Sequence, residues 1–293
     1  MLLIHKIEQT HFSASEAIII DYILDQGLKI KNMSANSIAK TTFTSPPLLV
    51  RIAKKLGYHG WNDFKEAYIN ELEYLFKEQN IDASIPFVVS DDIMTIAHNI
   101  GQLEIETLQD TMSLIKHDDL QQALRYLRDC KELDIYGVSN NLLLAEEFKA
   151  KLFYLHKNVN ICHLPGNANV QAAMSNENHC AILISYSGET NYIIKVANIL
   201  KHKKTPMIAI TSIADNNLSK LADVTLRMSS REMILTKIGD FATTTSIKYI
   251  LDTLYAGIFA FNYQKNLDYK IQIAKMVDDR HSGYEFIDED EKI

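Results

Sequence analysis

Five short apolar runs, each followed by a segment with helical spacing, constrain the fold of this 293-residue chain most strongly. Short apolar runs that alternate with helices are typical of parallel strands joined by right-handed crossovers. The pattern predicts an α/β unit built on a doubly wound, five-stranded parallel sheet, for which we take the common strand order 2-1-3-4-5. The five runs are LDIYGV (133–138), VNICHL (159–164), CAILIS (180–185), PMIAITS (206–212) and DVTLRM (223–228).

Small polar residues follow the first and the third of these runs. The first run leads into GVSNN (137–141), and the third leads into SYSGET (185–190). In the predicted strand order these two strands are neighbours whose connections diverge, and ligands bind beyond the carboxyl ends of strands at such a point. We therefore expect the two loops to line one crevice.

The residues of SYSGET suit an oxyanion. The hydroxyls of Ser185, Ser187 and Thr190 can donate to phosphate oxygens, and Gly188 permits close backbone approach. The helix that begins near Glu189 offers unpaired N–H groups and the positive end of its dipole. An ordinary strand-to-helix turn capped by Thr190 explains the same pattern, and spacing alone leaves both interpretations open.

The first third of the chain predicts short helices with clear starts. Ser13 and Glu16 have capping-box spacing before an apolar run, and Ser34 begins a second helix. Ser45, with Pro46 at the first helical position, begins a third. Such helices fit a helix-turn-helix and a plain three-helix packing unit equally well. The apolar face of the third helix consists of Leu49, Ile52, Ala53 and Leu56.

Charge is unevenly distributed along the chain, although the net charge is −7. Residues 26–62 contain no Asp or Glu, whereas acidic residues crowd the last sixteen positions. The acid-free interval indicates either an anion-binding surface near the N-terminus or an ordinary solvated face. Its basic residues are Lys29, Lys31, Lys40, Arg51, Lys54 and Lys55.

Residues 12–67 resemble the N-terminal helix-turn-helix of RpiR-type bacterial transcriptional regulators. The resemblance is carried by SASEAIIIDYIL, SANSIAK, the Ser45 cap and VRIAKKLGYHGWNDFK. It implies that the third helix enters the major groove of DNA, where phosphate contacts add affinity and base contacts add specificity. The implied DNA-binding residues are Ser45 on a phosphate, Pro47 and Leu48 against bases, Arg51 on a base edge or phosphate, and Lys54 and Lys55 on phosphates.

The turn before this helix departs from the family. Where the family usually reads Ala-Gly-Val-Ser, this chain has Thr42-Phe43-Thr44-Ser45. Glycine suits a positive φ angle and phenylalanine does not, so we expect the turn to be re-formed at a cost of about 1 kcal/mol.

Residues 130–263 resemble the SIS (sugar isomerase) domain, which has a flavodoxin-like strand order and binds phosphosugars. The resemblance rests on SYSGET at the end of the third strand, with support from IYGVSNN, MIAITS and IKYILDTLYAGI. In the first loop, Ser139 and Asn141 stand where the family usually has glycine and serine. The implied phosphosugar-binding residues are Gly137, Ser139, Asn140, Asn141, Ser185, Ser187, Gly188, Thr190 and Glu232.

The two resemblances together imply a transcriptional regulator of carbohydrate metabolism whose SIS domain senses a phosphorylated sugar. The alternative is a phosphosugar isomerase with an N-terminal assembly domain, in which Glu232 removes a proton and His163 supplies ring opening. A surface or capping role for His163 is the simpler interpretation, so we expect no catalytic residues and no enzyme activity. A degenerate SIS domain without a ligand is a third possibility.

The predicted organisation has four parts: a helix-turn-helix domain (1–76), a hinge-like linker (77–91), the SIS domain with its leading helices (92–270) and an acidic tail (271–293). The three cysteines lack CxxC spacing and fit a reduced, cytoplasmic protein. GxGxxG, the P-loop pattern and metal-ligand spacings are absent, so we expect neither cofactor nor metal. The expected partners are double-stranded operator DNA, a phosphosugar effector and a second copy, as homodimer or homotetramer, but no membrane.

Overall fold

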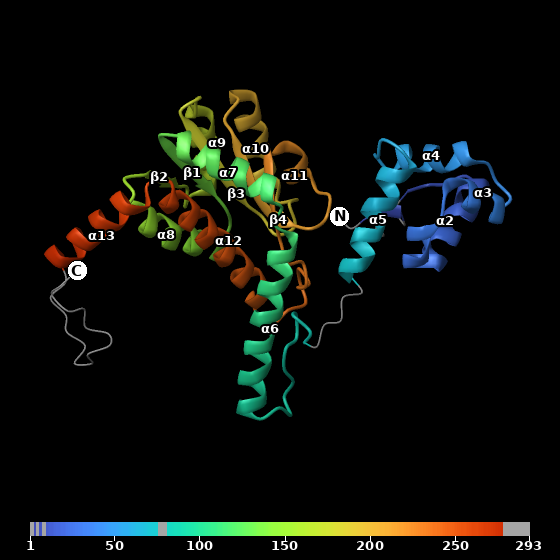
Figure 1. Cartoon of the computed structure of the whole chain (residues 1–293), viewed down its shortest axis with the longest axis horizontal. Coiled ribbons are helices and arrows are strands. Elements are labelled where there is room, and N and C mark those ends of the chain that lie inside the picture. Colours follow the sequence, from blue (N-terminus) through green and yellow to red (C-terminus); the bar gives the residue numbers. More distant parts are fainter. Residues whose placement is uncertain (1–2, 4–5, 8–9, 76–80, 278–293) are drawn as a thin grey trace.

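The computed structural model describes Leu3, residues 6–7, 10–75 and 81–277, in which a helical N-terminal unit precedes an α/β unit (Figure 1). The helical unit begins each of its three predicted helices at the expected cap, Ser13, Ser34 and Ser45. A short 3-10 helix that the sequence did not predict begins at Gly27. The elements are α2 (Ala14–Gln26), η1 (Gly27–Asn32), α3 (Ala35–Thr41), α4 (Pro46–Lys55) and α5 (Trp61–Leu75).

The apolar face predicted for α4 forms the centre of the helical unit. Leu49, Ile52, Ala53 and Leu56 are fully buried there, together with Phe64 of α5 and other apolar side chains. Burying one such aliphatic side chain contributes about 1.5–3 kcal/mol. This core therefore fixes α4 and leaves its opposite face to solvent.

The α/β unit has the predicted five-stranded parallel sheet in the order β2-β1-β3-β4-β5. Each crossover passes through a helix, so the carboxyl ends of all five strands lie at one edge. The elements are α6 (Ile93–Leu114), α7 (His117–Asp129), β1 (Glu132–Tyr136), α8 (Asn140–Phe153), β2 (Asn158–Ile161), α9 (Pro165–Met174), β3 (His179–Ile184), α10 (Asn191–Lys203), β4 (Met207–Ser212), α11 (Asn217–Leu221), β5 (Val224–Met228), α12 (Phe241–Ala260) and α13 (Tyr263–Val277).

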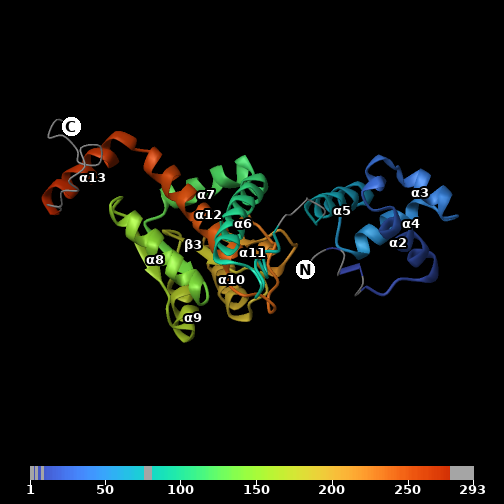
Figure 2. The ribbon, with the colours of Figure 1, turned by 90° about the horizontal axis from the view of Figure 1, so that it is seen from below.

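Helices cover both faces of the sheet (Figure 2). On one face α12 packs against α6, α7 and α8, and on the other α10 packs against α9 and α11. Two separate apolar cores result, one on each side of the central strand β3. This layering leaves the carboxyl edge of the sheet to the loops that follow β1, β3 and β5.

Two boundaries differ from the sequence expectations. Residues 81–86 of the predicted linker are fixed on the α/β unit, where Asn99 donates to the Pro86 carbonyl at 2.9 Å and Ala83 is buried beside Leu103. Residues 76–80 of that linker lie outside the described residues. The acidic tail was predicted from residue 271, but α13 continues to Val277, and residues 278–293 lie outside the described residues.

Candidate functional site

The loops after β1 and β3 meet at the carboxyl edge of the sheet and line one cavity of about 220 Å³, which we call the strand-end cavity. The adjacent β1 and β3 place both loops there, as the strand order predicts. The third wall comes from the segment between β5 and α12. The lining residues are Val138, Ser139, Asn140, Asn141, Tyr186, Ser187, Thr190, Ile234, Lys237, Asp240 and Thr243.

Two helix N-termini open at this cavity. Ser139 is the N-cap of α8 and Thr190 is the N-cap of α10, and neither uses its side chain to cap its own helix. First-turn amide groups at such positions are natural donors to an anion. Ser139 has a φ of +50°, a left-handed conformation that glycine adopts more easily, so the loop keeps a glycine-like geometry with a serine.

The residues of SYSGET divide into turn-forming and cavity-lining ones. Ser185 is buried, and its Oγ lies 2.9 Å from Oγ1 of Thr190 and accepts the amide of Gly188 at 3.2 Å. Ser187 is half-buried and lines the cavity with Thr190. Tyr186, Ser187 and Thr190 therefore line the cavity, while Ser185 holds the turn.

Packing explains why position 188 is a glycine. Its φ is +66°, and a Cβ at this position would lie 2.1 Å from the side chain of Asn216. Asn216 in turn caps α11 and donates to Thr211 Oγ1 at 3.0 Å. Gly188 is therefore required for packing against Asn216.

Lys237 is a cavity residue that sequence reasoning missed. Its Nζ lies 3.0 Å from Glu232 Oε2, 2.5 Å from Asp240 Oδ1 and 5.4 Å from the ring centre of Tyr186. Burial alone would lower the pKa of Lys237, but the hydrogen bonds to Asp240 and Glu232 outweigh it and raise that pKa. The cavity thus holds an ammonium that stays charged at neutral pH, beside the hydroxyls and the helix N-termini.

Glu232 does not line the strand-end cavity, in contrast to the expectation that it binds the ligand. Its side chain is fully buried, and both carboxylate oxygens are engaged. Oε1 accepts the amides of Ala242 at 2.5 Å and Thr243 at 3.2 Å, and Oε2 accepts the Thr243 hydroxyl at 2.5 Å and Lys237 at 3.0 Å. The negative charge of this carboxylate lies at the N-terminus of α12, where it interacts favourably with the positive end of the helix dipole. His163 also lies away from the cavity lining and pairs with Glu146 at 2.8 Å.

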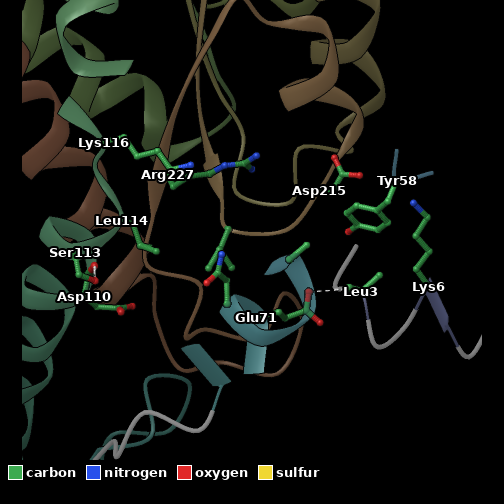
Figure 3. A pocket seen from close by; sticks show the side chains of 13 residues that line it. Leu3, Lys6, Tyr58, Glu71, Asp110, Ser113, Leu114, Lys116, Asp215 and Arg227 are labelled. Atoms are coloured by element: carbon green, nitrogen blue, oxygen red, sulfur yellow. Dashed lines mark hydrogen bonds between the residues drawn. The ribbon is translucent and has the colours of Figure 1, made fainter. Parts of the chain in front are cut away.

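A second cavity, of about 520 Å³, lies between the two units (Figure 3). Lys6, Tyr58 and Glu71 reach it from the helical unit, and Asp110, Lys116, Asp215 and Arg227 from the α/β unit. Its wall carries three carboxylates and three cations, so these charges balance. The strand-end cavity differs from it in having two helix N-termini at its wall, together with most of the residues that the sequence assigned to a ligand.

The outer face of α4 carries the residues that the sequence assigns to DNA. Ser45, Pro47, Arg51, Lys54 and Lys55 are exposed, and Leu48 is half-buried. Arg51 donates from Nε to Glu16 Oε1 at 3.0 Å, yet its side chain remains 65% exposed. Lys55 donates to the other oxygen of Glu16, also at 3.0 Å.

Glu16 links the helix start of α2 to this basic face. It is buried and completes the capping box with Ser13, whose amide donates to Oε2 at 2.9 Å. The Ser13 amide, with further help from Lys55 and Arg51, overcomes the effect of burial and lowers the pKa of Glu16 to about 2. Arg51 and Lys55, two of the six basic residues of the acid-free interval, are thus paired with Glu16, which lies outside that interval.

Phe43 has the left-handed backbone conformation that favours glycine. Its φ is +52°, and its side chain is 97% exposed. The expectation that the turn would be re-formed is therefore wrong, because the backbone retains a glycine-like left-handed residue and places the ring in solvent. Thr42 and Thr44 support the turn through their hydroxyls, 2.8 Å apart.

Comparison with known protein families agrees with this geometry. The profile of the helix-turn-helix domain of the rpiR family matches residues 1–74, and that of the SIS domain matches residues 126–255. The chain is also 26% identical over 263 residues to an HTH-type transcriptional regulator of Caldanaerobacter subterraneus subsp. tengcongensis, covering 88% of this chain and 90% of the relative.

Solved structures share the fold. The Vibrio vulnificus NanR protein complexed with ManNAc-6P is 23% identical, with a TM-score of 0.59 over 94% of this chain and 98% of NanR. The sugar isomerase domain of an RpiR transcription factor from Sphaerobacter thermophilus is 13% identical, with a TM-score of 0.54 over 61% of this chain and 98% of that domain.

Among the described residues, no helix combines the length and the apolar character needed to span a membrane. The two matched domains follow each other in the order found along the chain, helix-turn-helix first and SIS second. The chain belongs to the RpiR family of helix-turn-helix transcriptional regulators that carry a SIS domain.

Proposed function

We propose that this regulator binds operator DNA through α4 and adjusts that binding in response to a phosphorylated sugar in the strand-end cavity. The observation that carries the proposal is the cavity itself, in which Lys237, two hydroxyls and two helix N-termini surround one space at a parallel strand edge. Phosphate favours this combination of charge and donors. The NanR structure, whose bound molecule is ManNAc-6P, supports a sugar phosphate as the class of ligand.

The proposed ligand-binding set differs from the sequence expectation. Lys237 takes the place of Glu232 as the charged side chain that meets the ligand, since Glu232 is used by α12. Ser185 and Gly188 act by shaping the turn, and Gly137 is not among the residues that line the cavity. The residues proposed to line the ligand are Ser139, Asn140, Asn141, Ser187, Thr190 and Lys237.

The proposed DNA interface is the exposed face of α4. Lys54, Lys55 and Ser45 supply phosphate contacts, and Arg51 offers the part of its guanidinium that Glu16 does not hold. Pro47 and Leu48 supply apolar contacts in the groove. A helix-turn-helix reads paired half-sites through two-fold symmetry, so the active species is at least a homodimer.

A sensing role fits the site better than catalysis. An isomerase base must reach a substrate carbon, whereas Glu232 is fully buried with both oxygens engaged. His163 is paired with Glu146 on the surface. These contacts favour a non-enzymatic regulator.

Two measurements test the proposal. A thermal-shift panel of hexose, amino-sugar and pentose phosphates, with the unphosphorylated sugars as controls, should give a concentration-dependent rise in Tm for a phosphorylated member only. A gel shift with DNA from upstream of the chain's own gene should show binding that this sugar phosphate changes. Turnover of the sugar phosphate, abolished in Glu232→Gln, would contradict the sensing role.

A further inference from the structure

The segment between β5 and α12, residues 229–240, contacts both the strand-end cavity and the linker from the helical unit. We call it the β5–α12 loop. Ile234, Lys237 and Asp240 of this loop line the cavity. Arg231, Met233 and Ile238 of the same loop bond to residues 81–84. This one loop therefore contacts both the strand-end cavity and the linker.

Three hydrogen bonds from this loop to residues 81–84, together with a fourth from Arg231 to Glu106 of α6, form what we call the linker clamp. Arg231 donates from Nη2 to the Ile81 carbonyl at 2.7 Å and to Glu106 Oε2 at 2.8 Å, and its side chain is only 2% exposed. Ser84 accepts the Met233 amide at Oγ, 2.8 Å, and the Ile238 amide at its carbonyl, 2.9 Å. Two of these bonds depend on the side chain of Arg231 and one on the side chain of Ser84.

On the cavity side, the loop is held by charge. Lys237 lies between Glu232 and Asp240, and the Tyr186 hydroxyl donates to the Glu232 carbonyl at 2.6 Å. Glu232 stands directly between Arg231 and Met233 in the sequence. A shift of Lys237 or Tyr186 therefore acts on the residue that separates the two halves of the clamp.

Because the chain between the linker clamp and the helical unit is short, the position of Ile81 limits where the helical unit can lie. Helix α5 ends at Leu75, and six peptide steps separate Leu75 from Ile81. Such a stretch spans at most about 20 Å when fully extended. Fixing Ile81 on the α/β unit thus restricts the volume that the DNA-binding unit can occupy.

We propose that the β5–α12 loop transmits the occupancy of the strand-end cavity to the DNA-binding unit by changing the linker clamp, with Ser84 and Arg231 as positioning residues. The inference rests on the proposed function, since it names how that site regulates DNA binding. A phosphate in the cavity competes with Glu232 and Asp240 for the Lys237 ammonium and repels the Asp240 carboxylate. The β5–α12 loop then has different partners with and without the anion. A ligand shifts the equilibrium between two conformations only when it interacts differently with each of them, and these partners supply that difference.

Hydrogen–deuterium exchange on the full-length chain tests the first half of the inference, with inorganic phosphate and ManNAc-6P as probes. We expect either probe to protect residues 137–141 and 185–190 and also to change exchange at 81–86 and at the amides of Met233 and Ile238. Protection of the cavity loops without a change at 81–86, Met233 and Ile238 would overturn the inference and leave ligand binding intact. Protection at neither place, with these probes or with any other member of the sugar-phosphate panel, would overturn the proposed ligand function together with it.

Ser84→Ala tests the second half, and Ser90→Ala, at an exposed position of the same segment, is the matched control. In fluorescence anisotropy with the upstream DNA, ManNAc-6P should change the Kd of the wild type and of Ser90→Ala by about fivefold or more. Ser84→Ala should keep DNA binding and ligand protection while this ratio falls toward one. An unchanged ratio in Ser84→Ala would overturn the clamp as the route of coupling. DNA binding by no variant would instead contradict the proposed function.

Discussion

The ammonium of Lys237 lies 3.0 Å from a carboxylate oxygen of Glu232, and that carboxylate also accepts the first amides of α12. The lysine is thereby positioned at the cavity wall by a group that never reaches the cavity. The sequence assigned Glu232 to the ligand and gave Lys237 no role, whereas in the structure Glu232 is fully buried and Lys237 lines the cavity.

Lys237→Gln should weaken binding of the sugar phosphate. A charge-assisted hydrogen bond to an anion is worth about 1.5–3 kcal/mol, so the Kd should rise by about tenfold or more. Isothermal titration calorimetry measures the change. Lys195→Gln, on the exposed face of α10, is the control and should leave the Kd unchanged. Equal affinity of Lys237→Gln and wild type would remove Lys237 from the site.

Gly188→Ala should destabilise the α/β unit. The new methyl group would meet Asn216 at 2.1 Å on a residue with φ of +66°, and these two effects together cost about 2 kcal/mol or more. Gly101→Ala in α6 is the matched control, because its surroundings are open and alanine favours a helix by about 0.5–1 kcal/mol. Urea unfolding should give changes of opposite sign for the two variants, and a neutral Gly188→Ala would refute the packing role.

Glu16→Gln should loosen the helical unit and strengthen non-specific DNA binding. The lowered pKa of Glu16 means that its ionised form stabilises the fold above pH 4.5 and that this contribution is lost as pH falls toward about 2. The difference in unfolding free energy between wild type and Glu16→Gln should therefore shrink as the pH is lowered through this window.

The same substitution releases Arg51 and Lys55 from their shared carboxylate. Both cations then become available to phosphates, so binding to random DNA should tighten and its dependence on salt should steepen. Anisotropy measured at several salt concentrations tests this. An unchanged salt slope would mean that Glu16 does not restrain the basic face.

Phe43→Gly should raise the stability of the helical unit by up to about 1 kcal/mol, because it removes a side chain from a left-handed residue and exposes no new apolar surface. Phe43→Asn should act in the same direction, since asparagine tolerates this conformation, whereas β-branched Phe43→Val should destabilise. Thermal unfolding gives the order. A stabilising valine would show that backbone strain is not what Phe43 adds.

Most of the helices and strands could be predicted from the periodicity of apolar residues in the sequence. The five parallel strands and the helix starts at Ser13, Ser34 and Ser45 follow from local patterns. The strand order agrees with the SIS resemblance, and that order brings residues 137–141 and 185–190 together. These features depend on residues close together in the sequence, or on the rule that the carboxyl ends of parallel strands lie at one edge of the sheet, and both can be read from one sequence.

The remaining features depend on contacts between distant residues. Arg51 meets Glu16 across 35 positions, and Arg231 meets Ile81 across 150. Lys237 lies in a loop without periodic pattern, so only the packing of that loop against Tyr186 brings it to the cavity. Phe43 could not be placed from propensity, because the surrounding helices impose a backbone conformation that phenylalanine disfavours.

The most direct test of the account measures the affinity of the full-length chain for its upstream DNA by fluorescence anisotropy, with and without the sugar phosphate that raises its Tm. The account predicts salt-sensitive binding whose Kd changes by about fivefold or more when the sugar phosphate is added, with no turnover of the sugar. DNA affinity that is identical with and without a sugar phosphate bound in the strand-end cavity would contradict it.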